Sequence, residues 1–76
     1  MMRMVECTKA QALATTNHPD AVKENILRAY RGRWPKWEEV GLTRRGAKIC
    51  VKRVGCITYF RLSGYTPDGR DVELDQ

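Results

Sequence analysis

The sequence predicts an α+β domain in which one or two N-terminal helices pack on an antiparallel β-meander of three or four strands. Three patterns carry this prediction: a helical apolar stripe over 19–31, strict alternation over 48–62, and a second alternating segment over 70–74. At 76 residues the chain suits a single domain, helical over about 8–31 and β over about 38–75. A domain of this size buries only about 60% of its unfolded surface, so each element must contribute to the core.

A short first helix is expected to begin after Thr8. Thr8 and Gln11 have the spacing of a capping box, in which each side chain accepts a hydrogen bond from the other residue's backbone amide. The alanine-rich residues that follow favour a helix of about two turns. The polar stretch TTNHPD then ends it.

A second helix is predicted from Pro19 to about Arg31. Proline suits the first helical turn, and Asn17 or His18 can serve as the N-cap before it. Gly32 is a suitable end. Helical spacing places four residues on one apolar stripe: Val22, Ile26, Ala29 and Tyr30.

The stretch KICVKRVGCITYFRL, residues 48–62, is predicted to form a β-hairpin with Gly55-Cys56 as its loop. Glycine at the first position of a two-residue loop fits a type II′ turn. The loop pairs Val54 with Ile57 and so fixes the register along both strands. One face then carries Ile49, Val51, Phe60 and Leu62, and the other carries Lys48, Cys50, Lys52, Tyr59 and Arg61.

A third strand is expected over 70–74, after the turn-forming sequence YTPDG. Pairing it with the second arm of the hairpin places Val72 opposite Leu62 on the apolar face. The same register places Glu73 opposite Arg61 on the polar face, as an opposite-charge pair. One register therefore explains three segments.

A further strand is expected upstream, in EEVGL. Residues 43–46 can turn, which would place Leu42 opposite Ala47 and Val40 opposite Ile49. The two tryptophans nearby, in RGRWPKW, are expected to be core or lid residues.

Two alternatives to this topology remain. Pro35 can instead begin a short helix in place of the upstream strand. Alternatively, residues 44–54 can form the recognition helix of a winged helix-turn-helix. That helix would place Ala47, Cys50, Val51 and Val54 on one side, at the cost of many β-branched residues in a helix.

Charge is distributed unevenly along the chain. The net charge is +5, but residues 28–61 hold ten basic and two acidic residues, net +8. Residues 62–76 hold one basic and four acidic residues, net −3. A basic middle section indicates an anionic partner.

Enzymatic activity, a metal and a cofactor are not expected. The single histidine, His18, has no clear acidic partner, and phosphate-loop, G-x-S-x-G and H-E-x-x-H motifs are absent. Cys7, Cys50 and Cys56 are odd in number and include no C-x-x-C pair, which is typical of reduced structural thiols. Cys50, between two lysines, would have thiolate character if it were exposed.

Binding is therefore the expected function. Basic side chains around an aromatic ring suit a phosphate backbone with a stacked base, so the first hypothesis is nucleic-acid binding. The second is a protein-interaction module, such as an inhibitor or adaptor encoded by a phage or other mobile element, that meets an acidic protein surface. The candidate residues for either partner are Arg31, Arg33, Arg44, Arg45, Lys48, Lys52, Tyr59 and Arg61.

Localisation and assembly follow from the same composition. No apolar run approaches the roughly 18 residues of a membrane span, and the first residues lack the apolar core of a signal peptide. We therefore expect a cytoplasmic protein with no membrane partner. A homodimer is a further alternative for its assembly.

Overall fold

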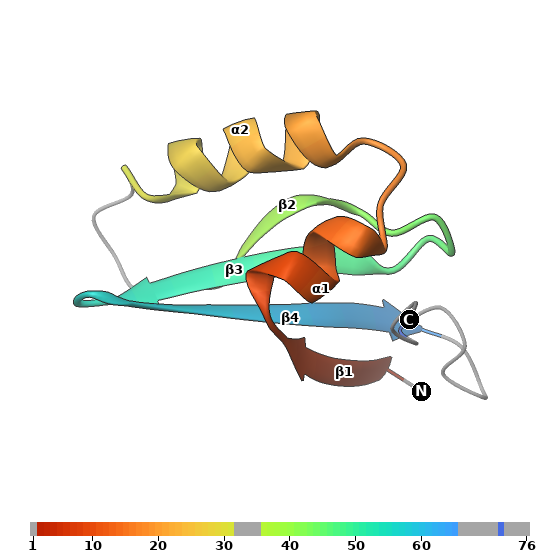
Figure 1. The fold of residues 1–76 in the computed structure, drawn as a ribbon. Helices are drawn as coiled ribbons and strands as arrows, with labels where there is room; N and C mark the ends of the chain where they lie inside the picture. The colour runs from red at the N-terminus through yellow and green to blue at the C-terminus, as the bar shows by residue number, and fades with distance from the viewer. Residues whose placement is uncertain (1, 32–35, 66–71, 73–76) are drawn as a thin grey trace.

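The computed structural model describes residues 2–31, 36–65 and 72, without the side chains of Met2 and Tyr65. It consists of two layers, a four-stranded antiparallel sheet and two helices that lie on one face of it (Figure 1). The predicted α+β class is confirmed. The strands are ordered β1-β4-β3-β2 across the sheet. The elements along the chain are β1 (Met2–Cys7), α1 (Lys9–Ala14), α2 (Pro19–Ala29), β2 (Glu38–Leu42), β3 (Lys48–Val54) and β4 (Ile57–Tyr65).

The first helix, α1, begins with the predicted capping box. The hydroxyl of Thr8 accepts a hydrogen bond from the Gln11 amide at 3.1 Å, and the Thr8 amide donates to Oε1 of Gln11 at 2.9 Å. These two bonds satisfy amides that a helix start otherwise leaves unpaired. At the other end, the buried hydroxyl of Thr15 donates to the Ala12 carbonyl at 2.6 Å.

The second helix, α2, lies over β2 and β3 and presents the predicted stripe to the sheet. It begins at Pro19, with His18 as N-cap, and ends at Ala29, slightly before the expected end. Val22 and Ile26 are buried against the strands. The two later members of the stripe pack at the edge of the same core.

The hairpin of β3 and β4 has the predicted register throughout, from the pair Val54–Ile57 to the pair Ile49–Leu62. Gly55 has a φ of 62°, and no described non-glycine residue has a positive φ. A positive φ at the first loop position alone is the requirement of the predicted type II′ turn. Residues 48–54 are therefore a strand, which excludes the helix-turn-helix alternative.

Strand β2 is present as predicted, but half of its register differs from the prediction. Up to Glu39, which pairs with Cys50, the expected register holds. A β-bulge then shifts the pairing, so that Gly41 rather than Val40 lies opposite Ile49. The predicted partners beyond the bulge are therefore wrong by one residue.

Helix α2 provides the physical reason for this bulge. The side-chain amide of Asn25 donates a hydrogen bond to the carbonyl of Val40 at 2.9 Å, which satisfies a backbone group at the irregularity. At the next residue, Gly41, the backbone passes directly beneath the side chain of Val22. The bulge thus fits the sheet to a helix that approaches it closely.

The remaining neighbour of β4 is β1, a strand that the sequence prediction did not include. The strand expected over 70–74 would occupy this edge, but β1 pairs there and Val5 lies opposite Leu62. The predicted pairing of Val72 with Leu62 is therefore wrong. Val72 lies in a 3₁₀ turn, yet its exposed fraction is 0%, so its expected burial is confirmed.

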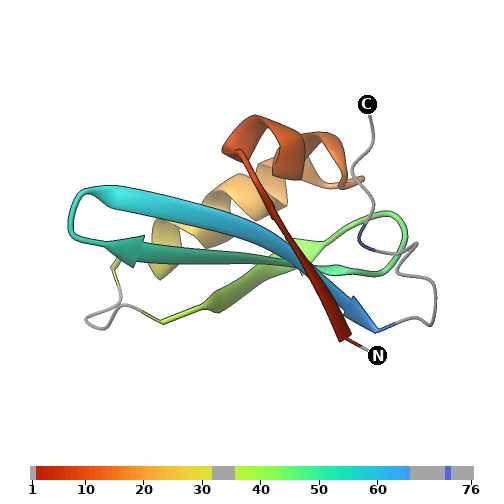
Figure 2. The ribbon, with the colours of Figure 1, turned by 90° about the horizontal axis from the view of Figure 1, so that it is seen from below.

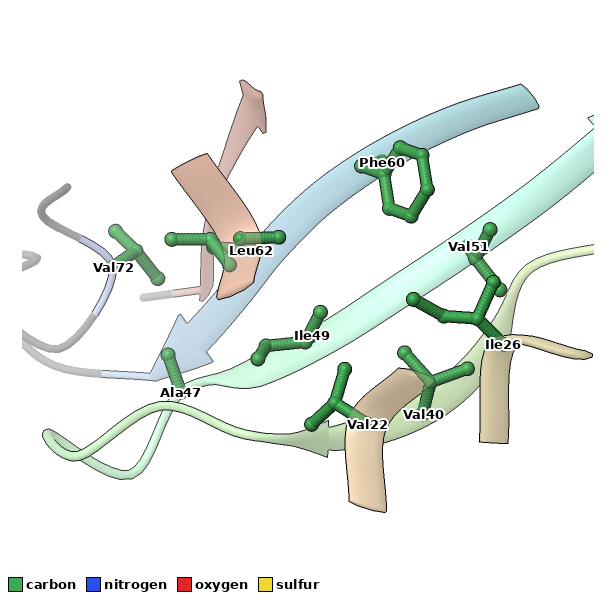
Figure 3. Packing of buried hydrophobic residues seen from close by; sticks show 10 residues of the cluster. Val22, Ile26, Val40, Ala47, Ile49, Val51, Phe60, Leu62 and Val72 are labelled. Carbon is green, nitrogen blue, oxygen red and sulfur yellow. The ribbon is translucent and has the colours of Figure 1, made fainter. Parts of the chain in front are cut away.

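The hydrophobic core fills the space between the sheet and the helices (Figure 3). It combines the apolar faces of β3 and β4 with side chains from α1, α2, β2 and the segment after β4. Val5 and Cys7 of β1 pack against its edge. Its buried members are Ala12, Val22, Ile26, Val40, Ala47, Ile49, Val51, Phe60, Leu62 and Val72.

The turn between β2 and β3 is attached to the loop between the helices. The Arg44 amide donates to the Thr15 carbonyl at 2.8 Å, and the Arg44 Nε donates to Oδ1 of Asn17 at 3.3 Å. Inside the turn, the Ala47 amide donates to the Thr43 hydroxyl at 3.0 Å. This end of the sheet is thereby joined to the helical layer.

Within the described part of the chain, no helix has the length and apolar composition that a membrane crossing requires.

Several sequence predictions lie outside the described residues. They are Gly32 as a helix end, the roles of Arg33, Trp34 and Pro35, the turn over 66–69, and the position of Glu73.

Candidate interaction face

The sheet has a second face that the helices do not cover. In Figure 2 the strands β3 and β4 pass in front of α2, so this face is seen directly. Side chains alternate along each strand, and the pairing register then assigns them to one face or the other. We call this the open face. Its described members are Met4, Glu6, Trp37, Glu39, Leu42, Lys48, Cys50, Lys52, Val54, Ile57, Tyr59, Arg61 and Ser63.

Arg61 lies at the centre of the open face, with Glu6 of β1 on one side and Cys50 of β3 on the other. Its guanidinium carbon lies 4.1 Å from the centroid of the Trp37 ring. A guanidinium on an indole is attracted by the ring electrons and stacks on its flat surface. The ring therefore holds Arg61 in one orientation.

The Arg61 side chain is partly exposed as a whole, but one of its nitrogens is not. Nε is buried and has no hydrogen-bond partner among the described residues. An unpaired buried donor costs about 1–3 kcal/mol, which the contact with Trp37 partly offsets. Arg61 thus combines a stem that is held by Trp37 with a side chain that is still partly exposed.

Trp37 also contacts a second cation. Lys52 Nζ lies 5.9 Å from the centroid of the same ring, and Lys52 pairs across the hairpin with the exposed Tyr59. Two aromatic residues therefore flank Lys52, one on the neighbouring strand β4 and one just before β2. This arrangement concentrates positive charge and aromatic surface at one end of the open face.

The contact between Trp37 and Arg61 explains the burial of Cys50. Strand β3 lies between β2 and β4, so the side chains of Trp37 and Arg61 can meet only over β3. Cys50 lies in this part of β3 and is only 8% exposed, although no helix covers it. Burial raises the pKa of the Cys50 thiol, and the Arg61 guanidinium opposes that rise. The thiolate expected for an exposed Cys50 is therefore not favoured.

Carboxylates lie in the same row as Arg61. Glu6 is its partner on β1, and Glu39 is the partner of Cys50 on β2. Both glutamates are exposed, and neither forms an ion pair with a cation of the described residues. The open face is therefore mixed in charge, with Lys48, Lys52 and Arg61 as its cations.

Exposed apolar side chains are concentrated on this face. Of the six large hydrophobic residues that are exposed in the described part of the chain, only Leu27 lies on a helix. The other five belong to the open face: Met4, Leu42, Val54, Ile57 and Tyr59, with exposed fractions from 44% to 57%.

Four sequence-predicted site residues come together here, since Lys48, Lys52, Tyr59 and Arg61 all lie on the open face. Two others, Arg44 and Arg45, are exposed in the turn just before β3 and extend the basic region beyond the end of the sheet. Arg31 is exposed in the turn after α2, in the helical layer, and so does not join them.

Trp37 is the site residue that the sequence prediction missed. It was expected in the core or as a lid, and it is half-buried on the open face. A signal for this position exists in the sequence. Extending the pairing of Glu38 with Val51 by one residue places Trp37 beside Lys52.

Comparisons of the chain with models of known protein families, with curated proteins and with solved structures find no match.

Proposed function

We propose that the chain is a small non-enzymatic binding module whose open face docks on the surface of another protein. The observation that carries the proposal is the concentration of exposed apolar side chains on this face. Val54, Ile57 and Tyr59 adjoin one another at the hairpin end of this face, and Met4 and Leu42 lie toward its other end. Exposed apolar patches on monomeric proteins typically mark interaction sites. Tryptophan, tyrosine, methionine and arginine are also enriched in protein interfaces, and each occurs on this face.

Charge indicates which kind of protein surface fits. The face has three cations and two carboxylates, and two further arginines lie in the adjacent turn. An acidic partner surface that contains apolar side chains complements this mixture. Aliphatic residues such as Ile57 and Met4 would gain little from a phosphate backbone, and Glu6 and Glu39 would repel it.

The proposal can be tested by changing the apolar part of the face. A triple variant with Met4→Ser, Ile57→Ser and Tyr59→Ser should lose a protein that co-purifies stoichiometrically after nuclease treatment. Leu27→Ser is the matched control, because Leu27 is equally exposed but lies on α2. Retention of the partner by a folded triple variant, or loss of the partner on nuclease treatment of the wild type, would contradict the proposal.

Nucleic-acid binding is the second candidate function, and one observation favours it. Tyr59 and Trp37 flank Lys52, which is an arrangement suited to stacked bases with a nearby phosphate. Labelled single-stranded DNA and RNA should then bind with an affinity that falls steeply with salt. Changing Lys48, Lys52 and Arg61 together to glutamine should abolish that binding. Absence of binding at low salt by the folded wild type would exclude this function.

A further inference from the structure

We propose that Arg61 is the anchor of the open face and receives a carboxylate from an acidic, partly apolar segment of the partner protein. The inference rests on the proposed function and specifies the chemistry of the partner. Arg61 is central, it is oriented by Trp37, it is partly exposed, and it forms no ion pair with a carboxylate of the described residues. An arginine with its stem already fixed loses little conformational freedom when it binds.

The burial of Arg61 determines how the carboxylate approaches. Nε is buried, so the pairing that uses Nε and one terminal nitrogen is blocked. The pairing that uses both terminal nitrogens remains available. It gives two parallel, charge-assisted hydrogen bonds to the two oxygens of one carboxylate.

The neighbours of Arg61 favour a carboxylate over a phosphate. Glu6 lies beside it on β1, and Glu39 lies across Cys50 on β2. Both repel an incoming anion, and the repulsion is greater for a phosphate monoester, which carries more than one negative charge at neutral pH. A singly charged, planar carboxylate matches the terminal fork at the smallest electrostatic cost.

The rest of the ligand segment follows from strand spacing. Tyr59 and Arg61 lie on the same face of β4, two residues and so about 7 Å apart. An extended peptide has the same repeat. An acidic residue with an apolar residue two positions away can therefore contact the Arg61 fork and the exposed Tyr59 ring together.

The experiment uses a displayed library of random dodecapeptides, selected on the full chain. We expect the selected peptides to be enriched in Asp or Glu with an apolar residue two positions away. The selected peptides are resynthesised and their affinity is measured by fluorescence anisotropy. They should bind Arg61→Gln at least about tenfold more weakly than the wild type. Changing their acidic residue to its amide should weaken binding to the wild type by a similar factor. Arg61→Lys, which keeps the charge but not the fork, should recover only part of the affinity.

Arg53→Gln is the matched control. Arg53 also lies over an aromatic ring, that of Tyr30 at 5.3 Å, but it belongs to the opposite face of β3, on the side of the helices. This variant should bind the peptides normally. Glu6→Gln should tighten binding by removing a competing charge.

The outcomes separate this inference from the proposed function. Peptides that bind the wild type and Arg61→Gln equally, but not the triple variant of the apolar face, would overturn the role of Arg61 and leave protein docking intact. Peptides that bind the triple variant as well as the wild type, or a library that yields no binder, would overturn both. Tighter binding to single-stranded nucleic acid than to any peptide would overturn the inference in favour of the second candidate.

Discussion

Gly41 lies so close to Val22 that a Cβ atom built on its backbone would come within 2.5 Å of Val22 Cγ2. Real side chains do not approach one another this closely. The absence of a side chain at Gly41 therefore sets the distance between α2 and the sheet. Since α2 supplies two buried residues to the core, this distance matters for the stability of the whole domain.

Replacing Gly41 with alanine should lower the free energy of unfolding by about 1–3 kcal/mol, because the new methyl group overpacks the contact with Val22. Urea unfolding followed by circular dichroism measures this change. Combining it with Val22→Ala should cost less than the sum of the single changes, since the smaller residue leaves room. Additive costs would contradict the packing explanation.

Replacing Asn25 with alanine should lower the free energy of unfolding by about 1–3 kcal/mol, because the Val40 carbonyl at the bulge loses its donor. The same unfolding measurement applies. Lys23→Ala on the exposed side of α2 is the control, and it should be nearly neutral. Equal effects of the two changes would show that the hydrogen bond does not stabilise the bulge.

Substitutions at Gly55 should lower the stability of the protein to different degrees, according to how readily the new residue adopts a positive φ. Gly55→Val should destabilise the protein by at least about 1–2 kcal/mol, because a β-branched residue is strained at a φ of 62°. Gly55→Asn should cost clearly less, since asparagine adopts this conformation more readily. No atom lies near a Cβ at this position, so any difference reports backbone conformation rather than crowding.

The three cysteines should react with a thiol reagent at different rates. Cys56, exposed in the hairpin loop, should react first, whereas the half-buried Cys7 and the buried Cys50 should react slowly. Trp37→Ala should accelerate the reaction of Cys50 and leave the rate of Cys56 unchanged. Mass spectrometry of the labelled peptides assigns each rate. An unchanged rate at Cys50 would mean that Trp37 does not shield it.

Alkaline pH should weaken the fold through Cys50. Its pKa is raised in the folded state because burial disfavours the thiolate. The stabilising contribution of the neutral thiol is therefore complete below the pKa of the unfolded state, and it is lost as the pH rises through the folded one. Unfolding free energies measured at neutral and alkaline pH should differ less in Cys50→Ala than in the wild type.

Local chemistry made much of this fold predictable. The capping box of Thr8 and the turn at Gly55 each depend on residues close together in the sequence, and both are confirmed. Once the loop fixed the register, alternation alone placed Lys48, Lys52 and Arg61 on one face.

The features that sequence reasoning missed depend on contacts between distant segments. The bulge at Val40 reflects the approach of α2, and β1 occupies the edge of β4 that the segment around Val72 was expected to fill. Two segments with similar alternation competed for that edge, and pairing rules alone do not rank them. The role of Trp37 depends on Arg61, two strands away, and so required the assembled sheet.

The pairing of β1 with β4 also has a consequence for how the protein is made. Met2 in β1 pairs with Tyr65 at the end of β4. During synthesis β1 must therefore remain without its partner until β4 has left the ribosome, and closing the long loop between these two strands slows folding. The finished sheet can form only after translation has passed β4, so a nascent chain stalled before that point exposes an unpaired strand edge.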